Sequence, residues 1–230
     1  MPLVYTLPTQ PERHVVNQTA NIVQTLLAWI DSGHLNPGDE VEESALVAQF
    51  GVSRTPVREA LMQIEATGLM HRLPRKGAVV FKPTLEEFLG ILEVHAKLEG
   101  QAAGLAARRL SPAGADALET ATAACETHFA TLANSEPDLY YQHNLRFHAC
   151  VAEAAGNPFL LEMIKTNARK LMAYYRARYR YAGSIEASAR EHRAIADLIF
   201  ARDSAAAETA MCRHVQFDHV TAMDLLAALG

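Results

Sequence analysis

The sequence predicts a mainly α-helical protein built from a short helix-turn-helix with a small β-hairpin, followed by an all-α bundle. Two observations predict this class. Before residue 84, apolar residues at helical spacing are followed by a glycine turn, a second helix and two short strand patterns. After residue 84, alanine and leucine dominate and strand patterns vanish. With 230 residues, the chain is long enough for two domains with separate cores.

The turn of the helix-turn-helix is the clearest local pattern. A short apolar-sided helix ends at about Phe50, because Gly51 follows and glycine takes a positive φ without a Cβ clash. Ser53 is a suitable N-cap, so the next helix begins near Arg54. Apolar residues at helical spacing form its inner face: Val57, Leu61 and Ile64.

This spacing leaves four polar residues near the start of the second helix and outside the core: Ser53, Arg54, Thr55 and Arg58. A recognition helix uses such positions to reach base edges and phosphates of DNA. Exposed arginines on a helix are common by themselves. The run of helix, glycine turn, capped helix and basic hairpin favours DNA binding.

The hairpin is predicted from residues 69–73 and 78–81, two short strand patterns that flank a tip at residues 74–77. The tip carries Arg75 and Lys76 beside Gly77. Two basic side chains at such a tip suit a wing that contacts the phosphate backbone or the minor groove. The N-terminal part is therefore expected to be a winged helix-turn-helix.

The segment Val52–Leu61 resembles the recognition helix of the GntR family of bacterial transcriptional regulators, and the resemblance extends from about Gln18 to Phe81. It implies that Arg54 and Arg58 contact bases, that Ser53 and Thr55 hold phosphates, and that Gly77 lies at the wing tip. The family often carries an arginine for DNA where this chain has Ser44. That departure implies weaker binding or a different operator sequence.

Composition indicates a soluble cytoplasmic protein. The net charge is −5, so a basic DNA-binding surface must be a local patch, which a homodimer would double. No apolar run approaches the roughly 20 residues of a membrane span, and no signal peptide is recognised. Three widely spaced cysteines in apolar context suit reduced thiols: Cys125, Cys150 and Cys212.

Six helices are predicted after the wing. Capping and turn residues place them at about 84–110, 111–134, 138–155, 159–181, 183–201 and 203–229. We therefore expect a tail at residues 1–14, the winged domain at 15–83 and the helical domain at 84–230. Short turns between the helices are typical of a bundle.

Three histidines share the apolar faces of three different helices: His148, His192 and His214. A single inward-facing histidine is usually a core residue with satisfied nitrogens. Three that converge are harder to explain, because burying several imidazoles is costly unless a metal accepts their lone pairs. Periodicity does not establish that they converge.

Residues from about Thr84 to Leu226 resemble the FCD domain, the all-α effector domain of the FadR subgroup of the GntR family. The resemblance is carried by residues 144–148, 154–160, 191–195 and 213–215. It implies a divalent metal held by the three histidines and by an aspartate four residues before the first of them. Zinc is the first expectation, with nickel or manganese as alternatives.

Two residues depart from that pattern. Asn144 stands at the aspartate position, where a neutral amide is a weak or absent ligand, so metal affinity falls or an anionic effector supplies the missing charge. His95 stands where related domains often carry an arginine for an effector carboxylate. His95 can take that role, add a metal ligand or fill space. Tyr141 shares the face of His148 and joins His95 and Asn144 in the predicted effector set.

Two classes of function follow. The first is a ligand-responsive transcriptional regulator, with repression the expected sign: a homodimer that binds operator DNA and senses a small organic acid beside the metal. The second is a metal-dependent enzyme that uses open coordination positions of the three-histidine site. No nucleophile pattern, phosphate loop or acid–base pair supports the enzyme, and it leaves the N-terminal part unexplained.

Overall fold

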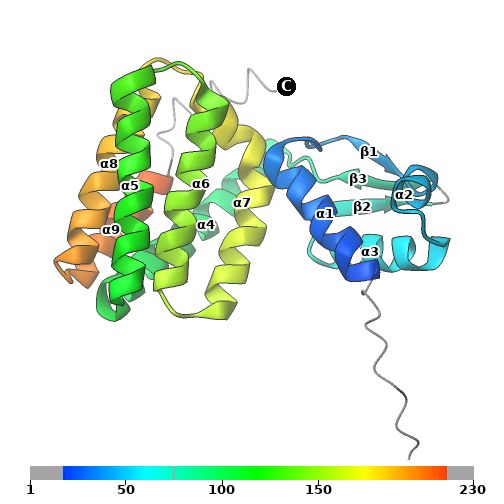
Figure 1. Ribbon diagram of the computed structural model, residues 1–230, viewed down its shortest axis with the longest axis horizontal. Coiled ribbons are helices and arrows are strands. Elements are labelled where there is room, and N and C mark those ends of the chain that lie inside the picture. The colour runs from blue at the N-terminus through cyan, green and yellow to red at the C-terminus, as the bar shows by residue number, and fades with distance from the viewer. Residues whose placement is uncertain (1–17, 75, 217–230) are drawn as a thin grey trace, which may run out of the picture. The chain divides into compact units, whose positions relative to one another are not determined.

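The computed structural model describes residues 18–74 and 76–216, which form helices and one small sheet (Figure 1). These residues divide into two compact units between Val79 and Val80, with the short segment 36–39 belonging to the second unit. The predicted fold class, a winged helix-turn-helix and an all-α bundle, is confirmed. The predicted tail at residues 1–14 and Arg75 lie outside the described residues.

The first unit contains α1 (Gln18–Ser32), β1 (Glu40–Glu42), α2 (Glu43–Phe50), α3 (Arg54–Ala66), β2 (Met70–Leu73) and β3 (Gly77–Val80). Its core lies where α1 packs against α3. Val57, Leu61 and Ile64 are buried there, as the helical spacing predicted. Gly51 ends α2 in the left-handed conformation and donates its N–H to the Val47 carbonyl, which confirms the predicted turn.

The sheet has three strands in the order β1-β3-β2, one more than predicted. β1 pairs antiparallel with β3, with Glu40 opposite Val79 and Glu42 opposite Gly77. The sequence did not reveal β1 because it has three residues, of which Val41 alone is buried. So short a segment gives no detectable alternation.

Gly77 begins β3, whereas the sequence placed it in the wing tip and started the strand one residue later. Its φ is +142°, and a Cβ at this position would overlap the Val41 carbonyl oxygen of β1. The glycine is therefore required by the close approach of a neighbouring strand. The tip that precedes it includes Lys76, whose carbonyl accepts the Glu43 N–H at 3.1 Å.

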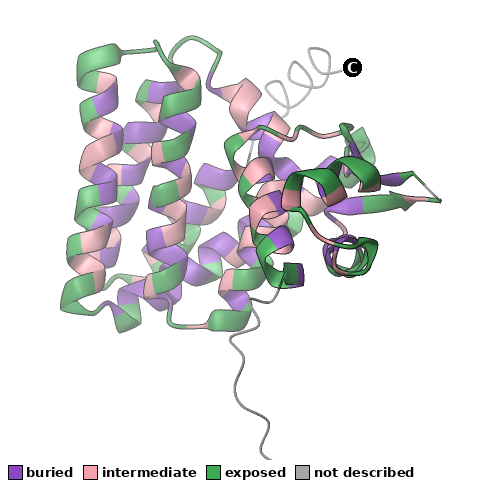
Figure 2. Ribbon diagram, turned by 45° about the vertical axis from the view of Figure 1, so that its right-hand side comes forward, coloured by how far each residue is buried: buried purple, intermediate pink, exposed green. Residues whose placement is uncertain are grey.

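In the described residues the second unit contains α4 (Leu85–Arg109), α5 (Pro112–Leu132), α6 (Pro137–Ala154), α7 (Pro158–Arg178), α8 (Ser184–Phe200) and α9 (Ser204–Val215). The predicted capping box is confirmed, because Thr84 Oγ1 accepts the Glu87 N–H and Glu87 Oε2 accepts the Thr84 N–H. Buried residues line the inward sides of these helices (Figure 2).

The last helix is shorter than predicted. It ends at Val215, whereas the sequence pattern placed its end near Leu229. The Arg178 guanidinium of α7 donates to the His214 carbonyl at 3.4 Å, which satisfies one of the carbonyls that a helix end leaves unpaired. The residues predicted to continue the helix, 217–229, lie outside the described residues.

α9 packs along α4 because α4 presents glycine to it. A Cβ at Gly100 would come within 2.9 Å of the Glu208 carbonyl oxygen, and a Cβ at Gly104 within 3.2 Å of the Ser204 carbonyl oxygen. The missing side chains let the two backbones approach closely. This packing carries His214 of α9 into the interior of the bundle.

None of the described helices combines the length and the hydrophobicity that a membrane crossing requires. The three cysteines form no disulfide: Cys125 and Cys150 are buried, and Cys212 is partly exposed.

Candidate functional site

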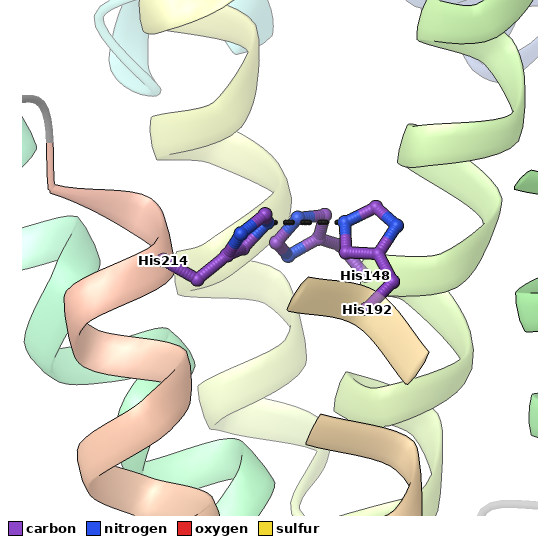
Figure 3. Close-up of side chains that lie close together, drawn as sticks. All are labelled: His148, His192 and His214. Carbon is purple, nitrogen blue, oxygen red and sulfur yellow. Dashed lines mark hydrogen bonds between the residues drawn. The ribbon is translucent and has the colours of Figure 1, made fainter. Parts of the chain in front are cut away.

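The three predicted histidines meet inside the bundle. His148 lies on α6, His192 on α8 and His214 on α9, and each offers a ring nitrogen within 4.8 Å of the others. Figure 3 shows the three rings turned toward one another, with Nε2 of His192 and Nε2 of His214 3.0 Å apart. The convergence that periodicity left open is therefore observed.

The surroundings of two of these histidines, His192 and His214, favour the uncharged imidazole. Burial lowers the pKa of His192 well below its ordinary value, and nearby His214 and His148 lower it further. Burial also lowers the pKa of His214 to about 4, although its hydrogen bond with Glu191 opposes the shift. A neutral imidazole keeps a lone pair on one ring nitrogen, which is the form that binds metal ions.

The donor set fits a divalent cation. Three imidazole nitrogens at these separations are the protein ligands of many four-coordinate zinc sites, with a fourth position left for water or a ligand. Nδ1 of His192 is buried and has no hydrogen-bond partner among the described residues. Without a cation, Nε2 of one ring can donate a hydrogen bond to Nε2 of the other at their separation of 3.0 Å, whereas a cation at this side would use the lone pairs of both atoms.

Glu99 is the residue that the sequence analysis missed. It lies on α4, is 2% exposed, and places Oε2 3.3 Å from Nδ1 of His148. Its Oε1 lies 3.6 Å from Nε2 of His95, one helical turn earlier. Burial alone would raise the pKa of Glu99, but neighbouring His148, His95 and His214 hold it below its ordinary value. The available signal was the i, i+4 spacing from His95 on an inward helical face.

The three predicted effector residues are all buried, but each has a different partner. His95 is buried beside Glu99, and burial lowers its pKa to about 4, with Glu99 opposing and His148 adding to the shift. Asn144 is buried, and its Oδ1 accepts the hydroxyl hydrogen of Tyr179 at 2.8 Å. Tyr141 is buried on α6, with the Arg176 guanidinium 5.6 Å from its ring centroid.

The four polar residues predicted on the recognition helix are exposed: Ser53, Arg54, Thr55 and Arg58. Ser53 has the extended backbone of an N-cap, but its side chain makes no capping hydrogen bond. Pro56, the third residue of α3, lacks an N–H, which removes one of the two donors that an N-cap hydroxyl commonly accepts from. The Ser53 hydroxyl is thus not engaged at the helix start.

Arg58 has a partner that the sequence did not indicate. Its Nε lies 2.9 and 3.0 Å from the two carboxylate oxygens of Glu43, the first residue of α2. The Arg58 side chain remains 54% exposed. The pair therefore holds the guanidinium at the turn without covering it.

Comparisons with known proteins agree with this architecture. Residues 18–80 match the family described as "Bacterial regulatory proteins, gntR family", and residues 90–217 match the FCD domain. The chain belongs to the GntR family and carries an FCD domain. It is a transcriptional regulator, and neither the matched families nor the named relatives support the metal-dependent enzyme.

An Escherichia coli K12 protein named as a regulatory protein of the L-lactate dehydrogenase operon is 28% identical, over 91% of this chain and 86% of its own. The HTH-type transcriptional repressor GlaR of E. coli K12 is 25% identical to this chain, and the match covers 80% of this chain and 86% of GlaR. The solved structure of E. coli McbR/YncC has a TM-score of 0.76 at 19% identity, covering 93% and 99% of the two chains. That likeness supports the fold alone.

Proposed function

We propose that this regulator is a cytoplasmic homodimer that reads two half-sites of operator DNA with its recognition helices. Arg54 and Arg58 would contact bases, Ser53 and Thr55 would hold phosphates, and the wing residues 75–77 would lie along the backbone or in the minor groove. The observation that carries this proposal is the exposure of the polar residues of α3. Repression is the proposed sign, as the name of GlaR states for that relative.

Operator binding by Arg58 can be tested directly. Arg58→Ala should weaken specific binding by about 1 to 3 kcal/mol, because a bidentate arginine–guanine contact is worth that much discrimination. A gel-shift titration at fixed salt measures the change. Arg146→Ala, an exposed arginine of α6, is the matched control and should leave binding unchanged. Equal affinity of Arg58→Ala and wild type would remove Arg58 from the base-contacting residues.

We further propose that the helical domain binds a divalent metal, zinc first and nickel or manganese as alternatives, through His148, His192 and His214. The ion supplies a positive centre that attracts a carboxylate. Because Asn144 is neutral, a small organic acid would bring the charge that an aspartate would otherwise provide. His95 would face that acid, with Asn144 and Tyr141 nearby.

The support for this second proposal is the approach of three imidazole nitrogens within 4.8 Å in a buried site. The acid would shift the bundle helices and so change operator affinity, since a ligand acts only through a difference in affinity between two states.

Exposed apolar side chains on α4 and α7 provide surface for the proposed dimer: Leu89, Val94, Phe159 and Met163.

Metal analysis of the purified protein tests the centre. We expect about one divalent ion per chain and its loss in His148→Ala, because two imidazoles hold a zinc ion much less tightly than three. His34→Ala, which removes an exposed histidine of the first unit, should retain the ion. Undiminished metal in His148→Ala would show that the three-histidine assignment is wrong.

A further inference from the structure

Two of the three histidines have a carboxylate at the same ring nitrogen. Glu191 of α8 places Oε2 2.7 Å from Nδ1 of His214. Glu99 of α4 places Oε2 3.3 Å from Nδ1 of His148. Nδ1 of His148 and Oε2 of Glu99 are buried, and neither atom has a hydrogen-bond partner among the described residues, although they lie 3.3 Å apart.

This arrangement selects one tautomer for each ring. A carboxylate only accepts hydrogen bonds, so it favours a proton on Nδ1 and leaves the lone pair on Nε2. Nε2 of His214 is the atom that faces His192, 3.0 Å from the Nε2 of that ring. In His214, Nδ1 therefore meets the carboxylate while Nε2 faces the cluster.

The charges add a second argument. Three neutral imidazoles bring no charge, and the Asn144 amide brings none, while its oxygen already accepts from Tyr179. A divalent ion in this interior would then be uncompensated, which is costly away from water. The carboxylates of Glu99 and Glu191 together supply two negative charges at the edge of the cluster.

We infer that Glu99 and Glu191 are outer-sphere positioning residues of the proposed metal centre: they orient His148 and His214 and supply negative charge at the edge of the cluster while no organic acid is bound. This inference rests on the proposed metal site. Outer-shell partners of metal-binding histidines typically change metal affinity by 10- to 100-fold when they are removed.

The experiment is a zinc titration of the purified full chain against a chromogenic chelator. Glu99→Gln and Glu191→Gln should each lower zinc affinity by about 10- to 100-fold. Glu153→Gln is the matched control, because it removes the same charge from an exposed side chain of α6 and should change nothing. Glu191 is partly exposed, so its variant stays informative if Glu99→Gln fails to fold.

Two spectroscopic measurements separate positioning from direct coordination. In the metal-free protein, nitrogen-15 NMR should find the Nδ1–H tautomer of His148 in wild type and a loss of that preference in Glu99→Gln. In the Co²⁺-substituted protein, the visible spectrum of Glu99→Gln should keep the wild-type coordination number. A changed coordination number would make Glu99 a direct ligand and overturn its outer-sphere assignment.

Failure of the inference is distinguishable from failure of the metal site. Wild type that binds no zinc would reject the metal centre itself. Wild type that binds zinc, with unchanged affinity in both glutamine variants, would leave the three-histidine centre standing and reject the role of the two glutamates.

Discussion

At the scale of single residues, the neighbours of each buried polar group in the helical domain set its charge and its contacts. His95 is an inward histidine in the sequence, but in the structure it lies against Glu99 of its own helix, with His148 of α6 and Tyr175 of α7 nearby. Burial outweighs the attraction of Glu99 and keeps His95 uncharged. The same neighbourhood places Glu99 at the histidine cluster.

His95 should make the protein lose stability as the pH falls. Its folded-state pKa, about 4, lies below the ordinary value of 6.5. The unfolded chain therefore takes up a proton first, and the stability present above pH 6.5 is lost as the pH falls toward 4. Between pH 7 and pH 5 this loss is about 1 to 2 kcal/mol.

Urea unfolding of metal-free protein at the two pH values measures the total loss, to which His192 and His214 also contribute because burial lowers their pKa values as well. His95→Gln should reduce the total loss by about 1 to 2 kcal/mol, because glutamine does not titrate. His34→Gln, on the surface of the first unit, should retain the wild-type loss. An unchanged loss in His95→Gln would mean that His95 does not drive the pH dependence.

At the scale of elements, Gly51 and Gly77, both predicted as turn residues, are required for different reasons. Gly51 has a φ of +63°, and a Cβ there would meet nothing within 4 Å. Gly77 combines a φ of +142° with the carbonyl of β1 directly beside it. The first glycine serves the backbone alone, whereas the second also makes room for a strand.

The two alanine variants should differ accordingly. Gly51→Ala should cost about 1 to 2 kcal/mol, the usual strain of an L-residue in the left-handed region. Gly77→Ala should cost more, because β1 must also move away from β3. Chemical denaturation of the full chain followed by circular dichroism compares the two. Equal costs would show that the contact with Val41 is not a constraint.

At the scale of the whole molecule, the two compact units hold separate candidate sites in one chain. The proposed DNA contacts belong to the first unit, and the histidine cluster belongs to the second. Ligands that bind a folded unit stabilise that unit by mass action. If zinc stabilises only one unit, that unit contains the zinc site.

Zinc should raise the Tm of the helical unit. At a free concentration about 100 times the Kd, the expected stabilisation is about 2.7 kcal/mol, and a chelator should reverse it. Scanning calorimetry measures the shift. His192→Ala should abolish it, while Arg58→Ala, in the winged unit, should retain it. A shift that persists in His192→Ala would place the zinc elsewhere.

The sequence by itself determined the order of the helices and caps such as that at Thr84, because capping residues, glycine turns and helical periodicity act over a few neighbouring positions. It did not determine the capping bond of Ser53 or the end of the last helix. It also determined which faces His148, His192 and His214 occupy. Only the tertiary structure decided that the three rings meet, since three helices must pack before their faces share one interior.

The same holds for partners that are distant in the chain. Glu43 with Arg58, Val41 with Gly77, and Glu99 with His148 lie 15 to 49 positions apart. No local pattern connects such positions. Folding brings these residues together, so the contacts of Arg58 and of the histidine cluster follow from the tertiary structure.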